Sequence, residues 1–255
     1  MQRIALVAVA AAAVAAAAAA AVIPRTAPAV QVKDWPAGVV TRCVANGTFA
    51  LTFDDGPWVY SQALLDILAA EGVSASFFVN GQNWGSIWDF GDELRNAHAA
   101  GHVLGSHTWD HADLVAVYQE SGAAGVADEM NQLADALEDL VGVRPAFMRP
   151  PYGSIDDAVL GVLTGLGYTA VVNWNVDSND WQHPDDPDAD LAEYKAAMGG
   201  IAPATASWIS LQHDVYNGTV ELFVPMAIQY VRSAGYQLVN MSACLGLPPY
   251  QPARL

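Results

Sequence analysis

Residues 50–57 read ALTFDDGP and place two aspartates where an apolar run meets a turn. A short apolar run that ends at Gly and Pro is typical of a buried strand. Successive side chains of a strand point to opposite faces, so Asp54 and Asp55 should not share one task. Taken alone, DDGP is a common turn signal. The stretch therefore predicts a strand end whose two carboxylates either shape the turn or act as two separate groups of one site.

Apolar runs of this kind recur along the chain and alternate with helical patterns. Seven of them are expected to be buried strands: 49–53, 75–81, 102–107, 146–151, 169–175, 208–214 and 237–242. Helices are expected over 61–70, 89–100, 126–141, 156–166, 191–198 and 220–233. Repeated β-α units with short connections imply a parallel sheet. We therefore expect a single α/β domain, and seven parallel strands suit a distorted, incomplete (β/α) barrel.

Unusual polar residues follow the expected strands. They are Asp54 and Asp55 after the first strand, His107 and His111 after the third, Arg149 and Tyr152 after the fourth, Asp177 and Asp180 after the fifth, and His213 after the sixth. In a β/α barrel the carboxyl ends of the strands gather on one rim, where active sites are built. This bias predicts that the polar residues form one site.

The segment SHTWDH, residues 106–111, contains two histidines four residues apart. On one helical turn His107 and His111 would face the same side, which is the arrangement that two imidazoles need to hold one ion. A histidine pair at this spacing is structural about as often as it is a metal site. One carboxylate on the same rim would complete a two-His, one-carboxylate set that leaves positions open for water.

The remaining motifs each allow a structural and a functional interpretation. In MRPPYG, Arg149 either lies in solvent or orients a catalytic carboxylate, and Tyr152 can offer its backbone N–H to an oxyanion. DSNDW at 177–181 can be a helix cap with an incidental Trp181. A histidine at a strand end, such as His213, is as often structural as catalytic. The other histidines, 98, 102 and 183, are interpreted as structural.

Composition limits the classes of partner. A net charge of -17 argues against nucleic acid, which would require clustered Lys and Arg. An acidic surface favours solubility or attraction to cationic products. The Ala-rich run up to Ile23, after Met1-Gln2-Arg3, is typical of a secretory signal peptide, with a membrane anchor as the alternative.

Two cysteines lie near the ends of the remaining chain. In an oxidising compartment, Cys43 and Cys244 would close a loop whose entropic contribution is about 4–5 kcal/mol in the chain-entropy model. Two buried free thiols are the alternative. Asn46, Asn217 and Asn240 begin N-glycosylation triplets, which matter only if the host glycosylates. We expect export through a eukaryotic secretory route.

Five motifs in this order, TFDDGP, GSHTWDHADL, MRPPYG, WNVDSNDWQ and ISLQHD, resemble the polysaccharide deacetylases of carbohydrate esterase family 4, the NodB-homology domain. Within that family the chain is similar to secreted fungal chitin deacetylases, whose flanking cysteines form a terminus-joining disulfide. The resemblance runs from about Cys43 to Leu247. Trp58 stands where such enzymes often carry tyrosine, which puts the rim of the substrate groove in question.

The resemblance implies a role for each motif residue. It implies binding of a divalent metal, Zn²⁺ or Co²⁺, by Asp55, His107 and His111. It implies a general base, Asp54, held by Arg149, and a general acid, His213, with Asp180 as its charge partner. It also implies an oxyanion contact from the Tyr152 backbone N–H and an acetyl pocket lined by Tyr152, Trp181 and Leu211.

The expected organisation is a signal peptide over 1–22, a lead-in over 23–42, the deacetylase domain over 43–247 and a tail over 248–255. The expected function is a secreted, metal-dependent removal of N-acetyl groups from chitin or chitooligosaccharides by a monomer with no obligatory protein partner, in the extracellular space or cell wall. Acetylxylan esterase and peptidoglycan deacetylase activities are alternatives from the same family. A non-catalytic carbohydrate-binding barrel is an alternative from another class.

Overall fold

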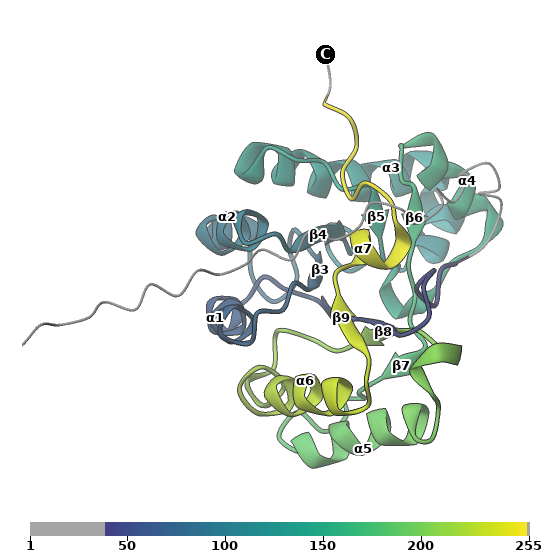
Figure 1. The fold of residues 1–255 in the computed structure, drawn as a ribbon. Helices are drawn as coiled ribbons and strands as arrows, with labels where there is room; N and C mark the ends of the chain where they lie inside the picture. Colours follow the sequence, from purple (N-terminus) through teal and green to yellow (C-terminus); the bar gives the residue numbers. More distant parts are fainter. Residues whose placement is uncertain (1–38, 254–255) are drawn as a thin grey trace, which may run out of the picture. The chain divides into compact units, whose positions relative to one another are not determined.

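The apolar run before the two aspartates forms two short strands rather than one. In the computed structural model, which describes residues 39–253 (Figure 1), β1 (Thr48–Ala50) and β2 (Thr52–Asp54) are separated only by Leu51. β1 pairs with β8 (Trp208–Leu211) and β9 (Gln237–Val239), whereas β2 pairs with β3 (Ser76–Val79). The run therefore crosses from one sheet to another, and Asp54 ends the second strand.

Two parallel sheets form the centre of the fold. The remaining strands are β4 (Val103–Ser106), β5 (Phe147–Met148), β6 (Ala170–Val171) and β7 (Val176–Asp177). The strand order is β2-β3-β4-β5-β6 in one sheet and β7-β8-β1-β9 in the other, with parallel pairing throughout. An isolated parallel bridge between Asp54 and His213 joins the two sheets. The expected parallel α/β architecture is confirmed, but the described residues contain nine short strands instead of seven longer ones.

Helices follow the strands as the sequence pattern predicts. The bounds are α1 (Ser61–Glu71), α2 (Gly91–Ala99), α3 (Leu114–Val141), α4 (Asp157–Gly165), α5 (Pro187–Met198), α6 (Val224–Ser233) and α7 (Met241–Leu245). A 3-10 turn precedes α2 and a π-helical turn precedes α6. The first six were expected, although α3 starts earlier and is interrupted by non-helical backbone at Gly122. Gly72 and Gly142 end α1 and α3 in the left-handed conformation that favours glycine.

Apolar side chains fill the space between sheets and helices. The largest buried cluster contains Phe49 and Phe53 from β1 and β2, Leu64 from α1, Leu104 from β4 and Phe223 before α6. In Figure 1, α1 and α2 lie beside β3 and β4, while α5 and α6 lie near β7 and β9. Burial of this kind contributes about 25 cal/mol per Å² of apolar surface, so the core fixes the strand ends that carry polar residues.

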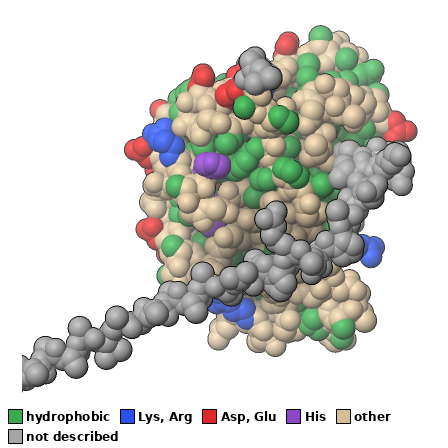
Figure 2. Space-filling model, turned by 45° about the horizontal axis from the view of Figure 1, so that its top comes forward, with side chains coloured by type: hydrophobic (Ala, Val, Ile, Leu, Met, Phe, Trp, Pro, Cys, Tyr) green, Lys and Arg blue, Asp and Glu red, His purple; other side chains and the backbone are tan. Residues whose placement is uncertain are grey.

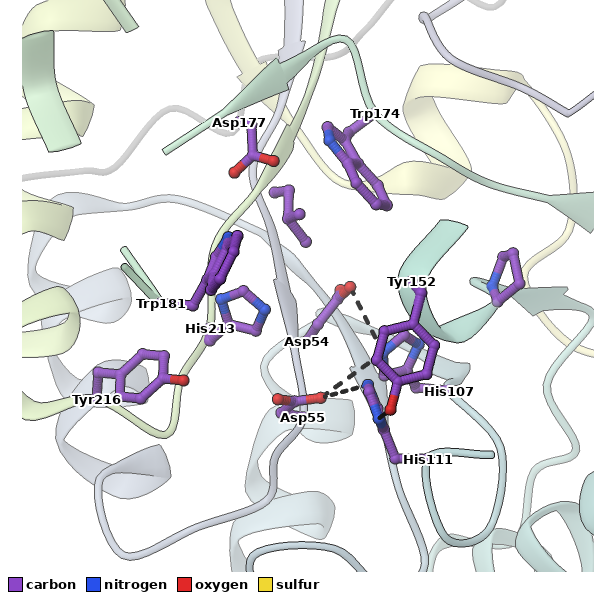
Figure 3. Close-up of a pocket in the computed structure, with 12 residues that line it drawn as sticks. Asp54, Asp55, His107, His111, Tyr152, Trp174, Asp177, Trp181, His213 and Tyr216 are labelled. Atoms are coloured by element: carbon purple, nitrogen blue, oxygen red, sulfur yellow. Dashed lines mark hydrogen bonds and ion pairs between the residues drawn. The ribbon is translucent and has the colours of Figure 1, made fainter. Parts of the chain in front are cut away.

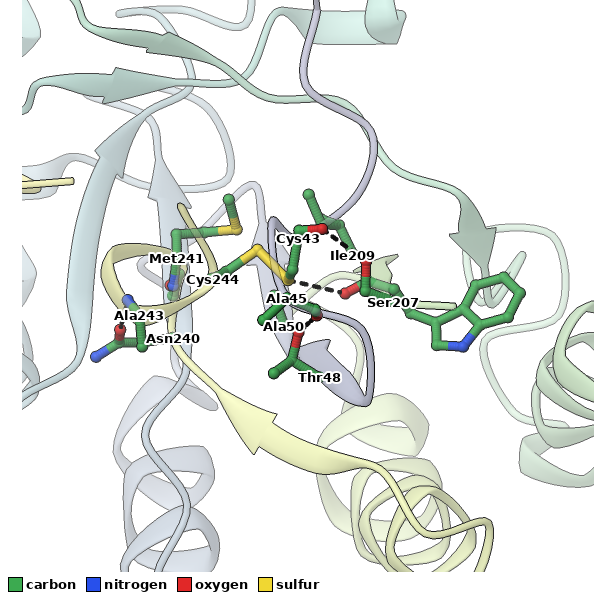
Figure 4. The surroundings of a disulfide bond; sticks show 12 residues. Cys43, Ala45, Thr48, Ala50, Ser207, Ile209, Asn240, Met241, Ala243 and Cys244 are labelled. Carbon is green, nitrogen blue, oxygen red and sulfur yellow. Dashed lines mark hydrogen bonds between the residues drawn. A yellow bond between two sulfur atoms is a disulfide. The ribbon is translucent and has the colours of Figure 1, made fainter. Parts of the chain in front are cut away.

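A disulfide joins the two ends of the described fold. Cys43, which precedes β1, is bonded to Cys244 of α7, and the two residues are 201 positions apart in the chain (Figure 4). The pairing predicted from the sequence is thus present in the structure. The alternative of two free thiols is wrong, because both cysteines take part in this bond.

The ends of the described chain also pack against the fold. Val40 forms a parallel bridge with Val172, and Ala146 N–H donates to Pro249 O at 2.8 Å. The predicted signal peptide and most of the lead-in lie outside the described residues. Among residues 39–253, no helix combines the length and apolarity needed to span a bilayer.

The surface carries the acidic excess that the composition indicates. Figure 2 presents one face, on which acidic side chains lie along the margin and basic ones are few. Of the three glycosylation triplets, Asn46 and Asn217 are exposed. The Asn240 side chain caps α7 by accepting from Ala243 N–H at 3.0 Å and donates to Gly101 O at 3.1 Å.

Candidate active site

One cavity of about 380 Å³ collects most of the residues that the motifs single out (Figure 3). Its lining consists of Asp54, Asp55, His107, His111, Pro150, Tyr152, Trp174, Asp177, Trp181, Leu211, His213 and Tyr216. Arg149 and Asp180, also predicted for the site, are fully buried and contact lining residues from outside the cavity. The sequence reasoning did not identify Trp174 or Tyr216, because aromatic residues beside a motif carry no signal of their own.

The two adjacent aspartates both reach this cavity but face different partners. Asp54 is 2 % exposed, and its Oδ1 accepts from Arg149 Nη1 at 2.7 Å. Asp55 Oδ1 lies 3.3 Å from His111 Nε2 and 3.6 Å from His107 Nε2. Strand alternation would send the second carboxylate to the opposite face, but Asp55 has a φ of 77°, which turns it back towards the cavity. The pair therefore divides into two functions within one site.

Asp55, His107 and His111 form the one cluster of ligand-type side chains found among the described residues, with ligand atoms within 4.8 Å of one another. His107 Nδ1 donates to Arg149 O at 2.7 Å, so its Nε2 carries the lone pair that faces Asp55. Burial lowers the pKa of His107 to about 3, which keeps this imidazole neutral.

The donor set fits a divalent cation. Asp55 Oδ1 is buried and accepts no hydrogen bond from any residue that the structure describes. A buried acceptor without a partner is costly, and a cation held with two imidazole nitrogens would satisfy it. Two histidines and one carboxylate also match the ligand types that Zn²⁺ prefers.

The two histidines do not converge on a helical turn, as the spacing suggested. Residues 107–113 form an irregular connection between β4 and α3. Thr108 and His111 have φ values of 70° and 62°. These left-handed residues reverse the chain locally and bring both rings to one side, with ring centroids 4.9 Å apart. The predicted pairing is present, but the helical geometry was wrong, because the local sequence of Asp, Thr and His does not reveal positive φ.

Arg149 is a buried partner of Asp54 rather than a solvent-exposed loop residue. Its Nε donates to Val172 O at 3.2 Å and its Nη2 donates to Ser210 O at 3.3 Å. The guanidinium carbon also lies 4.4 Å from the centre of the Phe78 ring. Burial raises the pKa of Asp54, and the positive charge of Arg149 opposes that rise. The arginine therefore favours the ionised form of this carboxylate and fixes its direction.

His213 and Asp180 form the second charged pair. Asp180 Oδ1 lies 2.8 Å from His213 Nδ1, and its Oδ2 accepts from the His213 backbone N–H at 2.8 Å and from Thr219 Oγ1 at 2.9 Å. Burial acts to lower the pKa of His213, but the charge and hydrogen bond of Asp180 raise it to about 9. Because the ring then carries a proton at neutral pH, His213 can donate that proton into the cavity.

Three further predicted residues shape the mouth of the cavity. Tyr152 is 71 % exposed with a φ of 61°, and it sits in a 3-10 turn whose first N–H groups lack intrahelical acceptors. Its hydroxyl lies 3.2 Å from His111 Nδ1, a contact that the sequence did not suggest. Trp181 is 54 % exposed, whereas Leu211 is buried in the wall. Trp58 packs on Trp84 and is not among the lining residues.

The three histidines interpreted as structural bond elsewhere. His98 Nδ1 lies 3.2 Å from the Tyr250 hydroxyl, and His102 Nδ1 accepts from Ala75 N–H at 3.0 Å. His183 pairs with Asp190 at 2.5 Å, in the connection before α5. None of the three belongs to the cavity lining.

Comparisons with known proteins agree with this geometry. The polysaccharide deacetylase family profile matches residues 41–171. The chain is 43% identical over 212 residues to a chitin deacetylase of Pestalotiopsis sp, covering 83% of this chain and 68% of that protein. It is 39% identical to a probable peptidoglycan-N-acetylglucosamine deacetylase of Arthroderma benhamiae, covering 84% of this chain and 47% of that protein. The solved chitin deacetylase structure from Colletotrichum lindemuthianum is similar with a TM-score of 0.78 and 35% identity, covering 84% and 95% of the two chains.

Proposed function

Since this chain belongs to the polysaccharide deacetylase family, we propose that it hydrolyses the N-acetyl groups of N-acetylglucosamine residues in chitin or chitooligosaccharides and releases acetate. The observation that carries the proposal is the convergence of three elements on one cavity: the Asp55, His107 and His111 set, the Asp54–Arg149 pair and the Asp180–His213 pair.

The ligand set would hold Zn²⁺ or Co²⁺ through the Asp55 carboxylate and the Nε2 atoms of His107 and His111. When bound, such an ion lowers the pKa of a water molecule and polarises a carbonyl group. The protein contributes the direction of the ligands. The hydrogen bond from His107 Nδ1 to Arg149 O selects the ligating nitrogen, and the contact between His111 and Tyr152 limits rotation of the second ring.

Asp54 is the general base of the proposal. Its Oδ1 is held by Arg149, which leaves Oδ2, 3.8 Å from His107 Nε2, as the oxygen that can take a proton from the attacking water. The water oxygen bonds to the acetyl carbon as its proton passes to Asp54. Because Arg149 is buried and bonded to Val172 and Ser210, the carboxylate is aimed before the substrate arrives.

His213 is the general acid. As the bond between the acetyl carbon and the sugar nitrogen breaks, the amine is a poor leaving group unless it gains a proton. Protonated His213 supplies that proton, and Asp180 stabilises the imidazolium beforehand. The products are acetate and a free amine, and the proton held by Asp54 returns to solvent.

The mouth of the cavity accounts for recognition of the acetyl group. The Tyr152 backbone N–H is placed in the proposal beside the negative oxygen that develops on the acetyl carbon, where preorganised donors lower the barrier most. The apolar walls supplied by Trp181 and Leu211 suit the acetyl methyl group. The sugar itself would lie across the open rim.

Peptidoglycan is a second candidate substrate, because one relative of 39% identity is named a probable peptidoglycan-N-acetylglucosamine deacetylase. Both polymers present the same N-acetylglucosamine unit. The test is acetate release from N-acetylglucosamine oligomers, peptidoglycan and acetylated xylan, after chelation and after Zn²⁺ or Co²⁺ is restored. We expect metal-dependent release that is fastest on the oligomers. Faster release from xylan would assign an esterase, and no release from any of the three would assign a carbohydrate-binding role.

We also propose that the protein acts outside the cell as a monomer. The Cys43–Cys244 disulfide supports an oxidising compartment. Recovery of the protein from culture medium with a new amino terminus near residue 22, together with a monomer mass in light scattering, is the expected result. Retention in the reducing cytosol would contradict this localisation.

A further inference from the structure

The candidate ligands come from two separate segments of one sheet. Asp55 follows β2, whereas His107 and His111 follow β4. β3 lies between these strands in the sheet order. Asn80 is the first residue after β3, and it is 2 % exposed. It therefore stands between the two halves of the ligand set, in a position where one residue can contact both.

Asn80 does contact both segments. Its backbone N–H donates to the carbonyl of Gly56, the neighbour of Asp55, at 2.9 Å. Its side-chain Nδ2 donates to the carbonyls of His107 and Thr108, the second at 3.1 Å. One buried residue thus connects the turn that carries the carboxylate to the loop that carries the imidazoles.

The loop needs such support because its backbone is strained. Thr108 and His111, like Asp55, adopt positive φ, which costs about 1–3 kcal/mol for each residue and persists only where the surroundings enforce it. Glu129 of α3 provides a second support: its Oε2 accepts from Trp109 N–H at 3.1 Å and from Asp110 N–H at 3.3 Å. Carbonyls on one side of the loop and N–H groups on the other are therefore both engaged.

We infer that Asn80 and Glu129 are positioning residues that hold the carboxylate and the two imidazoles at the separation a divalent cation requires, without contacting the ion themselves. The inference rests on the metal site of the proposed function. Residues that support metal ligands from behind change metal affinity by roughly 10- to 100-fold when they are replaced. Removing the support should therefore weaken metal binding although all three ligands remain.

The test is the dissociation constant of Zn²⁺, measured by competition with a chromophoric chelator. Asn80→Ala removes both side-chain donors, and we expect Zn²⁺ to bind roughly 10- to 100-fold more weakly. Asn83→Ala is the matched control: its one side-chain hydrogen bond within residues 39–253 goes to Asn80 Oδ1, so the bonds to the loop remain. The control should bind Zn²⁺ like the parent protein.

A second pair of variants leaves β3 intact. Glu129→Ala removes the acceptor for the two N–H groups, whereas Glu129→Gln retains an acceptor oxygen. We expect weaker Zn²⁺ binding in the first and near-parent binding in the second. The visible absorption of the Co²⁺-loaded proteins reports ligand geometry directly, and it should change in Asn80→Ala and Glu129→Ala but not in Asn83→Ala or Glu129→Gln.

The outcomes separate this inference from the proposed function. Parent-like Zn²⁺ affinity and Co²⁺ absorption in folded Asn80→Ala and Glu129→Ala would overturn the inference. If Asn80→Ala does not fold, the comparison of Glu129→Ala with Glu129→Gln decides. Asp55→Asn, measured in the same assay, is the reference for a lost ligand. Unchanged affinity in Asp55→Asn would instead overturn the ligand assignment on which the proposed function stands.

Discussion

Asp54 and Asp55 are adjacent in the chain, yet one is bonded to an arginine and the other faces two imidazoles. Neighbouring carboxylates usually compete for the same surroundings. Here the left-handed backbone at Asp55 gives each carboxylate its own environment. Substitutions at the two positions should therefore produce different failures.

Asp55→Asn should lower Zn²⁺ affinity, because an anionic ligand is lost, and excess metal should restore part of the activity. Asp54→Asn should retain the metal but lose roughly 10²- to 10⁴-fold in rate, because a proton acceptor is lost. Elemental analysis beside acetate release distinguishes the two. Equal metal loss in both variants would mean that both carboxylates bind the ion.

The pair of His213 and Asp180 determines the alkaline limit of activity. His213 must carry its proton to act as an acid, and its pKa of about 9 keeps it protonated at neutral pH. We expect kcat/KM to fall as the pH rises through about 9. Asp180→Asn removes the negative charge that raises this pKa, so the alkaline limb should move to lower pH. A limb at the same pH in both proteins would assign it to another group.

At the scale of elements, the helices and the parallel pairing were predictable because they depend on periodicity over many residues. The division of the first strand was not, since nothing in FALTF marks Leu51 as the crossing point between sheets. The short helix α7 was hidden inside a run interpreted as a strand, although Asn240 is a normal helix cap.

The candidate site was predictable to the level of residues but not of geometry. Motif order identified the residues with charged or ligating groups, because their chemistry is visible in the sequence. Asn80 and Glu129 were not identified, because a residue that acts through backbone contacts with a loop distant in sequence leaves no local pattern.

The turn after β2 is packed tightly enough to be tested with glycine substitutions. A Cβ at Gly56 would lie 2.3 Å from both carboxylate oxygens of buried Asp214, which is itself bonded to Ser61 Oγ at 2.7 Å. We expect Gly56→Ala to lower the free energy of unfolding by about 1–3 kcal/mol through overpacking.

Gly161 of α4 is the matched control. A Cβ there would meet no described atom within 4 Å. Because glycine weakens a helix interior, Gly161→Ala should raise the free energy of unfolding by about 0.5–1 kcal/mol. Urea unfolding of both variants measures the difference. Equal stability changes of one sign would show that the contact with Asp214 is not the cause.

At the scale of the whole molecule, the ends of the fold are joined twice. β1 pairs with β9, and the disulfide connects the segments beside them. We expect Cys244→Ala to lower the free energy of unfolding by about 2–5 kcal/mol, the usual effect of removing a native disulfide. Activity of the folded fraction should be retained, because neither cysteine lines the cavity.

Peptide mapping of the non-reduced protein should recover the linked peptides of Cys43 and Cys244. Two free thiols in exported material would contradict the bond. A Cys244→Ala variant as stable as the parent would show that strand pairing alone holds the ends together.

The bond has a consequence for survival among extracellular proteases. Suppose that a protease cuts once beside exposed Asp185, in the connection before α5. The fragment with Asp54, His107 and Asp180 would then be separated in sequence from the fragment with His213. Because Cys43 lies in the first fragment and Cys244 in the second, the two would stay tethered. Their reassembly is then intramolecular, at an effective concentration on the order of millimolar, and does not depend on dilution. A nicked molecule would migrate as one species until it is reduced.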